Sequence, residues 1–263
     1  MKAVFFTDLD GTLLDHDTYS YDLSIEGIKL LHRHLIPLIP VSSKTFEEMN
    51  GLMTELGLGS PFAFENGSGI AFPGSGHDYN VEITGPGIEQ LQKFFPELER
   101  ISGRKCISLL SIPDDEIVRI TGLDRVRAVL SIKRISSLPF IMQDEHLLPD
   151  SEIQEINTEL TAYNLHVTKG GRFNHLVPLP SGKDYAIKKI IEFYRDKYND
   201  EIITGAAGDS MNDLPMLDCV DHSYIIRKKD GSFIAGAKGK VMEKNGPAGF
   251  TLAVEDFLGK VTD

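Results

Sequence analysis

Two aspartates separated by one residue stand directly behind an apolar run near the start of the chain. The stretch VFFTDLDGTLLD places Asp8 and Asp10 after Val4, Phe5 and Phe6, just ahead of a Gly-Thr pair. An apolar run of this kind is typical of a strand buried on both faces, as in the centre of a parallel sheet. Like charges past the end of such a strand are costly unless a cation or strong hydrogen-bond donors lie beside them. The stretch therefore indicates a site.

Further polar residues stand at the ends of other predicted elements. Ser42 and Ser43 end IPLIPVSS, Asp209 and Asp213 follow EIITGAAG, and Lys183 begins an amphipathic helix. Ligands of open α/β sheets bind beyond the carboxyl ends of the strands, so we expect these side chains to converge. Several carboxylates directed at one point suit Mg²⁺, a hard cation that prefers oxygen ligands. A lysine and a hydroxyl beside the metal suit a phosphoryl group, which needs positive charge and donors around its oxygens.

The elements that would position these residues alternate between strand and helix at both ends of the chain. The first part predicts strands and helices in the order strand 3–7, helix 22–35, strand 36–43, helix 44–59, and a strand with a glycine-rich turn over 61–72. The spacing in the first helix places Leu35 on one apolar face with Ile25, Ile28 and Leu31. The last part predicts helix 183–198, strands 201–210 and 223–227, and helix 250–258. This alternation predicts an α/β fold with a doubly wound, Rossmann-like parallel sheet.

The middle of the chain has a different pattern. Helical stretches alternate there with short strands such as LPFIMQ, and the helices are predicted over 87–95, 114–121, 124–133 and 151–163. The stretch LHVTKGGRFNHLVPL predicts a hairpin that turns at Gly170 and Gly171. A mixed α+β block between two parts of one sheet indicates an inserted cap. We therefore predict a catalytic core of residues 1–83 and 179–263, and a cap of residues 84–178 that selects the substrate.

Composition narrows the class of partner. The formal net charge of −12 over 263 residues argues against nucleic acid or an anionic membrane as a partner. No apolar stretch approaches the roughly 20 residues that a membrane helix needs. The two cysteines lack metal-ligand spacing, and the N-terminus lacks the profile of a signal peptide. We expect a cytoplasmic protein, monomeric or a small homo-oligomer, that acts on a small molecule.

The order of the motifs resembles that of the haloacid dehalogenase superfamily of phosphohydrolases. DLDGT, a serine at a strand end, a lysine and GDSMNDLPML follow one another across the whole chain. A cap between the second and third of these motifs resembles the Cof-like subgroup, whose caps are α/β structures. The resemblance implies a Mg²⁺-dependent phosphatase that forms an aspartyl-phosphate.

The resemblance also implies roles for the four aspartates. Asp8 would attack phosphorus and become the aspartyl-phosphate. Asp10 would protonate the leaving alcohol and then activate the hydrolytic water. Asp209 would ligate Mg²⁺ together with Asp8 and the backbone carbonyl of Asp10, and Asp213 would hold these ligands in place.

Three further residues would bind the transferring phosphoryl group by the same resemblance, namely Ser42, Lys183 and Asn212. The neighbouring Ser43 is the alternative to Ser42, because both hydroxyls stand at the same strand end.

A narrower resemblance is to mannosyl-3-phosphoglycerate phosphatases, through TDLDGTLLDHDTYSY, VSSKT, ENGSGI, TKGGRFNHL and GPAGF. It implies hydrolysis of mannosyl-3-phosphoglycerate to mannosylglycerate, a compatible solute. The candidate ligands for the glycerate carboxylate or the sugar are Arg172 and His175 in the hairpin, Arg134, and Lys44. A guanidinium matches a carboxylate by its fork geometry. The alternatives are an exposed hairpin arginine for Arg172 and a mere first helical turn for Lys44.

Other functions share part of this pattern. A glucosyl-3-phosphoglycerate phosphatase, another sugar phosphatase or a phosphohexomutase of the same superfamily would contain the same motifs. A phospho-accepting signalling receiver also combines a strand-end aspartate, Mg²⁺ and a lysine on a doubly wound sheet. Receivers are much shorter, however, and lack both a cap and an acid two residues after the nucleophile.

Overall fold

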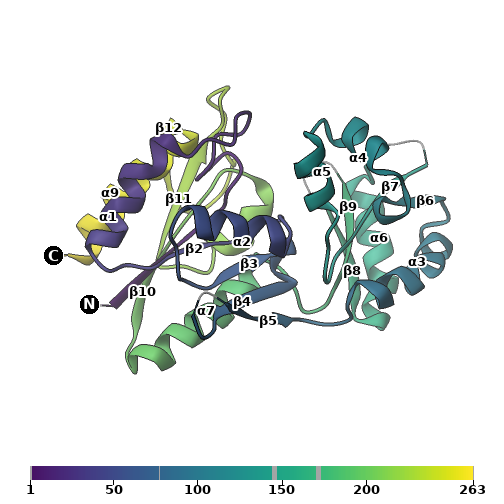
Figure 1. Cartoon of the computed structure of the whole chain (residues 1–263), viewed down its shortest axis with the longest axis horizontal. Coiled ribbons are helices and arrows are strands. Elements are labelled where there is room, and N and C mark those ends of the chain that lie inside the picture. Colours follow the sequence, from purple (N-terminus) through teal and green to yellow (C-terminus); the bar gives the residue numbers. More distant parts are fainter. Residues whose placement is uncertain (1, 77, 144–146, 170–172, 263) are drawn as a thin grey trace.

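Two lobes, each built around its own sheet, make up the protein in the computed structural model (Figure 1). The structure describes residues 2–76, 78–143, 147–169 and 173–262. Residues 88–178 form the smaller lobe, called the cap lobe below, and residues up to 83 and from 179 onward form the core lobe. The two predicted domain boundaries, after residues 83 and 178, stay predictions.

A five-stranded parallel sheet is the centre of the core lobe, which confirms the predicted fold class. Its strands lie in the order β12 (Lys240–Asn245), β11 (His222–Arg227), β10 (Ile202–Gly208), β1 (Lys2–Thr7) and β2 (Leu38–Pro40). In the register of β1 with β10, Thr7 lies opposite Ala207. The two strands that precede the predicted acidic residues are therefore neighbours, and their carboxyl ends meet.

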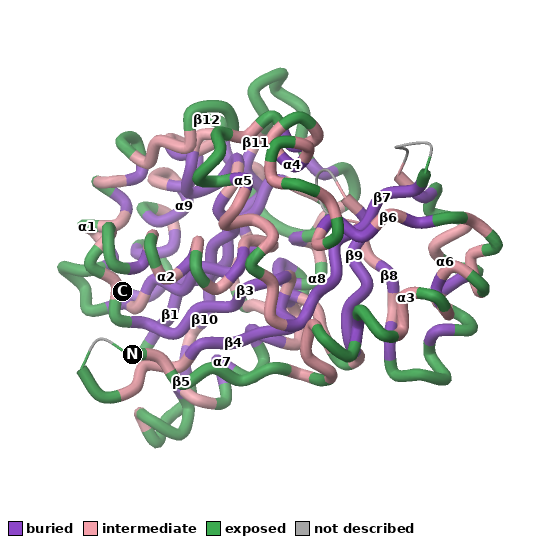
Figure 2. Tube along the Cα trace, turned by 45° about the vertical axis from the view of Figure 1, so that its right-hand side comes forward, coloured by how far each residue is buried: buried purple, intermediate pink, exposed green. Residues whose placement is uncertain are grey.

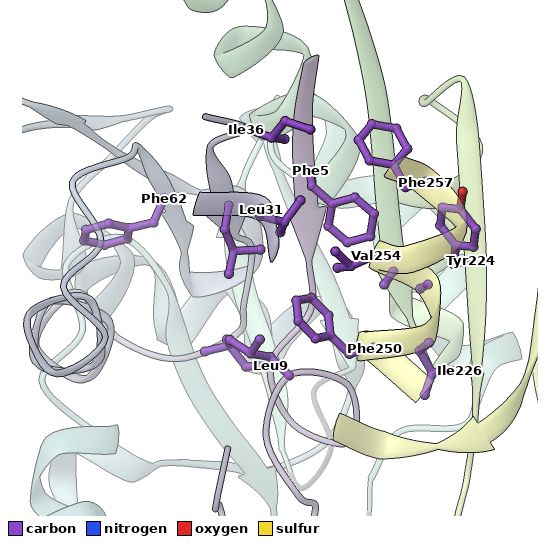
Figure 3. Close-up of a cluster of buried hydrophobic side chains, with 14 of the residues drawn as sticks. Phe5, Leu9, Leu31, Ile36, Phe62, Tyr224, Ile226, Phe250, Val254 and Phe257 are labelled. Atoms are coloured by element: carbon purple, nitrogen blue, oxygen red, sulfur yellow. The ribbon is translucent and has the colours of Figure 1, made fainter. Parts of the chain in front are cut away.

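Burial on both faces explains why the apolar run of β1 forms a central strand. Phe5 packs with Phe250 and Phe257 of α9 (Gly246–Val261), as Figure 3 shows. Helix α1 (Ile25–Arg33) lies beside α9 on the same face of the sheet. Phe6 points to the opposite face, where it joins the apolar residues of α7 (Lys183–Tyr198). Figure 2 shows that the tube is buried along most of β1 and β10.

The remaining core elements extend the sheet toward the cap lobe. A three-stranded antiparallel sheet contains β3 (Phe62–Phe64), β4 (Gly69–Pro73) and β5 (Tyr79–Ile83), and an isolated bridge between Val41 and Ala63 joins it to the end of β2. Helix α2 (Phe46–Glu55) buries Met49 and Met53 beside it. Short helical elements complete the lobe: 3₁₀ turns at Asp22–Ser24, Glu65–Gly67 and Met211–Asp213, and α8 (Leu214–Leu217).

The cap lobe has an antiparallel sheet of four strands. Their order is β6 (Cys106–Ser108), β7 (Leu138–Met142), β9 (Asn174–Pro178) and β8 (Leu165–Lys169). The helices of the lobe are α3 (Ile88–Ser102), α4 (Asp114–Thr121), α5 (Arg125–Ser131) and α6 (Asp150–Leu160), with 3₁₀ turns at Leu109–Ser111 and Thr161–Tyr163. Apolar side chains of α3 and α6 pack with those of the sheet in one cluster. The predicted turn at Gly170 and Gly171 lies outside the described residues.

Two sequence predictions about helices are wrong in detail. Leu35 is not on the apolar face of α1, because the helix ends at Arg33 and Leu35 is 86% exposed with a φ of 55°. Helix α3 continues past the predicted end at residue 95, through Pro96, to Ser102. The apolar spacing of this helix persists at the buried Leu98, so packing outweighs the lost backbone hydrogen bond at proline.

Among the described residues, none of the helices has the length and apolar character needed to span a membrane.

Candidate active site

Three carboxylates meet at the carboxyl ends of β1 and β10. Asp8 follows β1, Asp209 follows β10, and Asp213 ends the 3₁₀ turn after it. One oxygen of each lies within 4.8 Å of the others, and the three residues are only 6%, 5% and 0% exposed. The structure thus brings together the acidic side chains that the strand ends were expected to contribute.

Lys183 is the first residue of α7, and its side chain contacts this carboxylate cluster. Its Nζ donates hydrogen bonds to Oδ1 of Asp8 at 2.5 Å and to Oδ1 of Asp213 at 2.6 Å. Burial by itself would lower the pKa of Lys183, but the carboxylates of Asp213 and Asp8 outweigh it and raise that pKa. The lysine is therefore a fixed positive charge.

The cluster has more negative charge than Lys183 can neutralise. Burial, and then the charge of Asp213, raise the pKa of Asp8 well above its ordinary value. The same two causes raise the pKa of Asp209 to about 6. Three buried carboxylate oxygens facing one another are the kind of donor set that suits a hard divalent cation. The residues present therefore fit a metal ion at this point.

Asp213 orients the loop that contains Asp209. Its Oδ2 accepts hydrogen bonds from the backbone N–H of Asp209 at 3.1 Å, and from the backbone N–H and the hydroxyl of Ser210, both at 2.9 Å. Its Oδ1 accepts from Lys183. With both oxygens occupied in this way, Asp213 is suited to holding ligands in place.

The glycine of DLDGT has a physical reason in this site. Gly11 has a φ of +91°, and a Cβ at that position would lie 2.7 Å from Oδ2 of Asp209. A larger residue would push against the carboxylate. The hydroxyl of the next residue, Thr12, donates to Oδ1 of Asp209 at 3.3 Å. The DLDGT turn thus shapes the space around a carboxylate almost 200 positions away in the sequence.

Asp10 has surroundings different from those of the cluster. Its Oδ2 pairs with Nζ of Lys44 at 3.0 Å, and its side chain is 37% exposed. Its Oδ1 is buried and has no hydrogen-bond partner among the described residues. Asp10 lines the same cavity as Asp8, so a second carboxylate lies at the cavity beside that of Asp8.

A cavity of about 710 Å³ lies over these residues and has walls from both lobes. The predicted site residues that line it are Asp8, Asp10, Ser42, Lys44, Arg134, His175, Asp209 and Asn212. Ser43 lines it as well, so both serines of the VSSKT stretch reach the cavity. Lys183 and Asp213 are not in the lining and contact Asp8 and the Asp209 loop instead. Arg172 lies outside the described residues.

The cap wall of the cavity combines a buried histidine with an arginine. His175, on β9, is 3% exposed, and burial followed by the charge of Arg134 lowers its pKa to about 3. Its Nδ1 has no hydrogen-bond partner within the described part of the chain. Nη1 of Arg134 donates to the backbone carbonyl of Ser43 at 2.8 Å. A neutral imidazole and a guanidinium thus face the cavity from the cap lobe.

The structure adds residues to the site that the sequence analysis did not single out. The ring of Tyr19 contacts two cations, with Nζ of Lys44 4.9 Å and the guanidinium of Arg127 4.6 Å from its centre. Tyr19 also has a φ of 60°, which is rare for an aromatic residue. The loop 227–230 and the start of α9 line the cavity on another side. The stretches HDTYSY and GPAGF contain some of these residues, but their types alone indicate no role.

Comparison with known proteins identifies the family. Residues 5–117 match the haloacid dehalogenase-like hydrolase family. A protein from Methanococcoides burtonii is 34% identical over 274 aligned residues, which cover 99% of this chain and 98% of that protein. A protein from Persephonella marina is 32% identical and covers 85% of this chain and 84% of its own. Both are named glucosyl-3-phosphoglycerate/mannosyl-3-phosphoglycerate phosphatase.

Solved structures show the same fold. A phosphatase of the haloalkanoate superfamily from Bacteroides thetaiotaomicron has a TM-score of 0.69 and 18% identity, covering 98% of this chain and 95% of that one. A haloacid dehalogenase-like hydrolase from B. subtilis has a TM-score of 0.66 and 15% identity, covering 99% of both chains. At such identities the likeness concerns the fold. The family is shown by the two sequence relatives, which are more than 30% identical over 99% and 85% of this chain: the chain belongs to the haloacid dehalogenase-like hydrolases.

Proposed function

We propose that this protein is a Mg²⁺-dependent phosphatase that removes the phosphate of mannosyl-3-phosphoglycerate or glucosyl-3-phosphoglycerate. The family and the names of the relatives support a phosphoric monoester hydrolase that acts on a sugar phosphate. The observation that carries the proposal is the pair formed by Asp8 and Asp10. One carboxylate is bound by Lys183 in the buried cluster, and the other faces the cavity two residues later.

In the proposed reaction Asp8 is the nucleophile. Lys183 binds Oδ1 of Asp8, which leaves Oδ2 to attack phosphorus. The bond between phosphorus and the leaving oxygen breaks, and the leaving alcohol takes a proton from Asp10. In the second half Asp10 takes a proton from water, the water oxygen attacks phosphorus, and the bond from phosphorus to Asp8 breaks. Ser42, Lys183 and Asn212 are proposed to bind the phosphoryl oxygens, with Ser43 as the alternative to Ser42.

A Mg²⁺ ion fits the buried oxygen cluster of Asp8 and Asp209, with the backbone carbonyl of Asp10 as a further proposed ligand and Asp213 behind them. When bound, it would neutralise the negative charge that gathers around the phosphoryl group. The protein's own residues do the rest: they orient Asp8, keep Lys183 charged and place Asp10 at the cavity.

Substrate choice is proposed to depend on the cap wall. Nε and Nη1 of Arg134 donate to the backbone carbonyls of Ser131 and Ser43, so Nη2 is the nitrogen proposed to donate to a substrate carboxylate. The neutral His175 can exchange hydrogen bonds with a hydroxyl. Lys44 and Arg172 are the other two proposed contacts, although only Lys44 is among the described residues. A phosphorylated sugar–glycerate has both a carboxylate and hydroxyls. The cytoplasmic location and the monomeric or small homo-oligomeric state remain predictions from the sequence.

Phosphate release from a substrate panel tests the proposal. The panel contains mannosyl-3-phosphoglycerate, glucosyl-3-phosphoglycerate, mannose 6-phosphate, glucose 6-phosphate and p-nitrophenyl phosphate, each with MgCl₂. We expect the specificity constant for a sugar–phosphoglycerate to exceed that for the hexose phosphates by about a hundredfold, since one charge-assisted carboxylate contact is worth roughly 1.5–3 kcal/mol. Equal constants would indicate a general sugar phosphatase. Interconversion of hexose phosphates without phosphate release would indicate a phosphohexomutase.

A further inference from the structure

A buried glutamate that the proposed reaction does not use connects the two lobes. Glu65, in the 3₁₀ turn between β3 and β4, has no exposed surface. Its Oε1 accepts a hydrogen bond from the backbone N–H of Ile135 at 2.7 Å. Its Oε2 accepts from the backbone N–H of Ser136 at 3.1 Å and from the hydroxyl of Ser137 at 2.7 Å. Among the described residues no lysine, arginine or histidine pairs with it, so these three donors from the cap lobe are what stabilise its carboxylate.

The backbone of the same turn holds the strand end that contributes to the cavity. The N–H of Glu65 donates to the carbonyl of Lys44 at 2.8 Å, and the N–H of Asn66 donates to the carbonyl of Ser42 at 2.9 Å. Glu65 and Asn66 have φ angles of 50° and 58°. Such conformations cost about 1–3 kcal/mol each and persist only where the surroundings fix them. The surroundings therefore hold the turn in a strained conformation, and in this conformation both the Glu65 side chain and the N–H groups of the turn make their hydrogen bonds.

Other contacts close a ring between the same two segments. Arg134, directly before the residues that Glu65 binds, donates to the carbonyl of Ser43 at 2.8 Å. The hydroxyl of Thr45 donates to the carbonyl of Leu130 at 3.1 Å. Residues 130–137 of the cap lobe and residues 42–45 of the core lobe thus contact each other directly, and both stretches contact the turn at Glu65.

We propose that Glu65 is a positioning residue for substrate specificity: it fixes cap segment 134–137, which includes Arg134, at a set distance from Ser42 and Ser43. The reaction at Asp8 needs only the core lobe, whereas recognition of the rest of the substrate needs the cap wall at the right distance. Glu65 is the group whose side chain and backbone contact both walls. The proposal deepens the proposed function, on which its catalytic test rests.

The donors around Glu65 require a carboxylate. Two of them are backbone N–H groups, which can only donate, and a carboxylate can only accept. In Glu65→Gln, the amide NH₂ would face one of these N–H groups, leaving a buried donor without an acceptor. Because the side-chain volume hardly changes, this variant tests the hydrogen bonds rather than the packing.

The catalytic test compares a large substrate with a small one. In Glu65→Gln we expect kcat/KM for the preferred sugar–phosphoglycerate to fall roughly tenfold to a hundredfold, mainly through KM, as for loss of hydrogen bonds to a charged group. For p-nitrophenyl phosphate, which is too small to depend on the cap wall, we expect less than a threefold change. Glu55→Gln is the matched control, because Glu55 accepts a hydrogen bond from Tyr21 within the core lobe.

A double variant tests whether Glu65 acts through Arg134. If it does, Glu65→Gln combined with Arg134→Ala loses no more than Arg134→Ala alone on the sugar–phosphoglycerate. If the loss in the double variant equals the product of the two single losses, the proposal is overturned. Equal losses of Glu65→Gln on the sugar–phosphoglycerate and on p-nitrophenyl phosphate would overturn it as well.

Hydrogen exchange supplies a readout that needs no substrate. The backbone N–H groups of Ile135 and Ser136 are bound by Glu65, so we expect peptides covering 134–137 to exchange at least tenfold faster in Glu65→Gln, with peptides of β1 and β10 unchanged. Unchanged exchange at 134–137 would overturn the proposal. If the wild type hydrolyses neither sugar–phosphoglycerate, the proposed function fails, and the exchange result still decides whether Glu65 fixes the cap segment.

Discussion

Asp8 and Asp10 are two positions apart in the sequence but lie in different electrostatic surroundings. Asp8 is buried among other carboxylates and bound by Lys183, whereas Asp10 is partly exposed and pairs with Lys44. A nucleophile must keep one oxygen aimed at phosphorus, and an acid–base group must exchange protons with the substrate and water. The two surroundings match these two tasks, which leads to the first prediction.

Asp8→Asn should abolish turnover, because an amide cannot form the acyl phosphate that the carboxylate forms when it attacks phosphorus. Asp10→Asn should lower kcat by roughly 10²–10⁴, the usual worth of acid–base assistance. Phosphate release measures both, and circular dichroism confirms that the variants fold. Wild-type activity in Asp8→Asn would refute the covalent mechanism.

The buried His175 should make the protein sensitive to acid. Its folded-state pKa of about 3 lies below the ordinary 6.5, so between these values the unfolded chain binds more protons and stability rises with pH. The stability is fully present above pH 6.5. At pH 5, the loss from this residue is roughly 2 kcal/mol of unfolding free energy, at 1.36 kcal/mol per pH unit.

Urea unfolding at pH 7.5 and pH 5 measures this effect. In His175→Gln, the difference in unfolding free energy between the two pH values should shrink by about the 2 kcal/mol given above. His32→Gln, on the exposed side of α1, is the control for removing a histidine. If the difference in unfolding free energy between the two pH values is as large in His175→Gln as in the wild type, His175 is not neutral in the folded protein at pH 5.

At the scale of elements, two tight turns meet where the first and last parts of the chain touch. A Cβ on Gly67 would lie 2.1 Å from the carbonyl oxygen of Gly182, the residue before α7, and Gly67 has a φ of +81°. Lys183 begins that helix. The close approach of the two backbones therefore helps to set where the lysine enters the carboxylate cluster.

Gly67→Ala should destabilise the protein strongly and lower activity with it. The change adds overpacking, typically about 1–3 kcal/mol, to the cost of a positive φ. Gly57→Ala is the matched control, because Gly57 has a φ of +64° but nothing within 4 Å of its Cβ position. Urea unfolding compares the two. A loss in Gly67→Ala no larger than in Gly57→Ala would contradict the role given to the close approach.

Elements with a strong apolar pattern could be predicted from the sequence, and those without one could not. β1 and β10 are nearly continuous apolar runs, and their ends give the positions of Asp8 and Asp209. β12 has a single buried residue, Met242, so no periodic signal marks it. The antiparallel pairing of β3 with β4 depends on a positive-φ turn after Phe64, which the apolar pattern does not reveal.

The same contrast holds for the site. Residues of the DLDGT and GDSMND motifs are recognisable because unusual residue types follow buried strands. Glu65 and Tyr19 are not, because their importance comes from partners far along the chain, Ile135 for one and Arg127 for the other. Only the folded structure brings these partners together.

At the scale of the whole molecule, the buried carboxylates should link metal binding to stability. Mg²⁺ at the cluster would offset the repulsion between Asp8, Asp209 and Asp213, so binding should favour the folded state. We expect MgCl₂ to raise Tm. At a Mg²⁺ concentration of a hundred times Kd, the unfolding free energy should increase by about 2.7 kcal/mol. EDTA should abolish phosphatase activity.

NaCl at equal ionic strength controls for general screening of the net charge of −12. Asp209→Asn should lose most of the gain in Tm. Full activity after exhaustive chelation, or the same Tm with either salt, would refute the metal site.

The cap lobe's apolar cluster, built from residues of 88–178, has a consequence for how this enzyme can change over generations. Substitutions distant from one another and without shared contacts affect stability almost independently. A lineage can therefore remodel the cap wall, and the compounds admitted beneath it, while the packing around Phe5 and Phe6 stays intact. The reaction can therefore be retained while the range of substrates changes. The exceptions are the few places where the two lobes bind each other, because the contacting residues of both lobes must change together there.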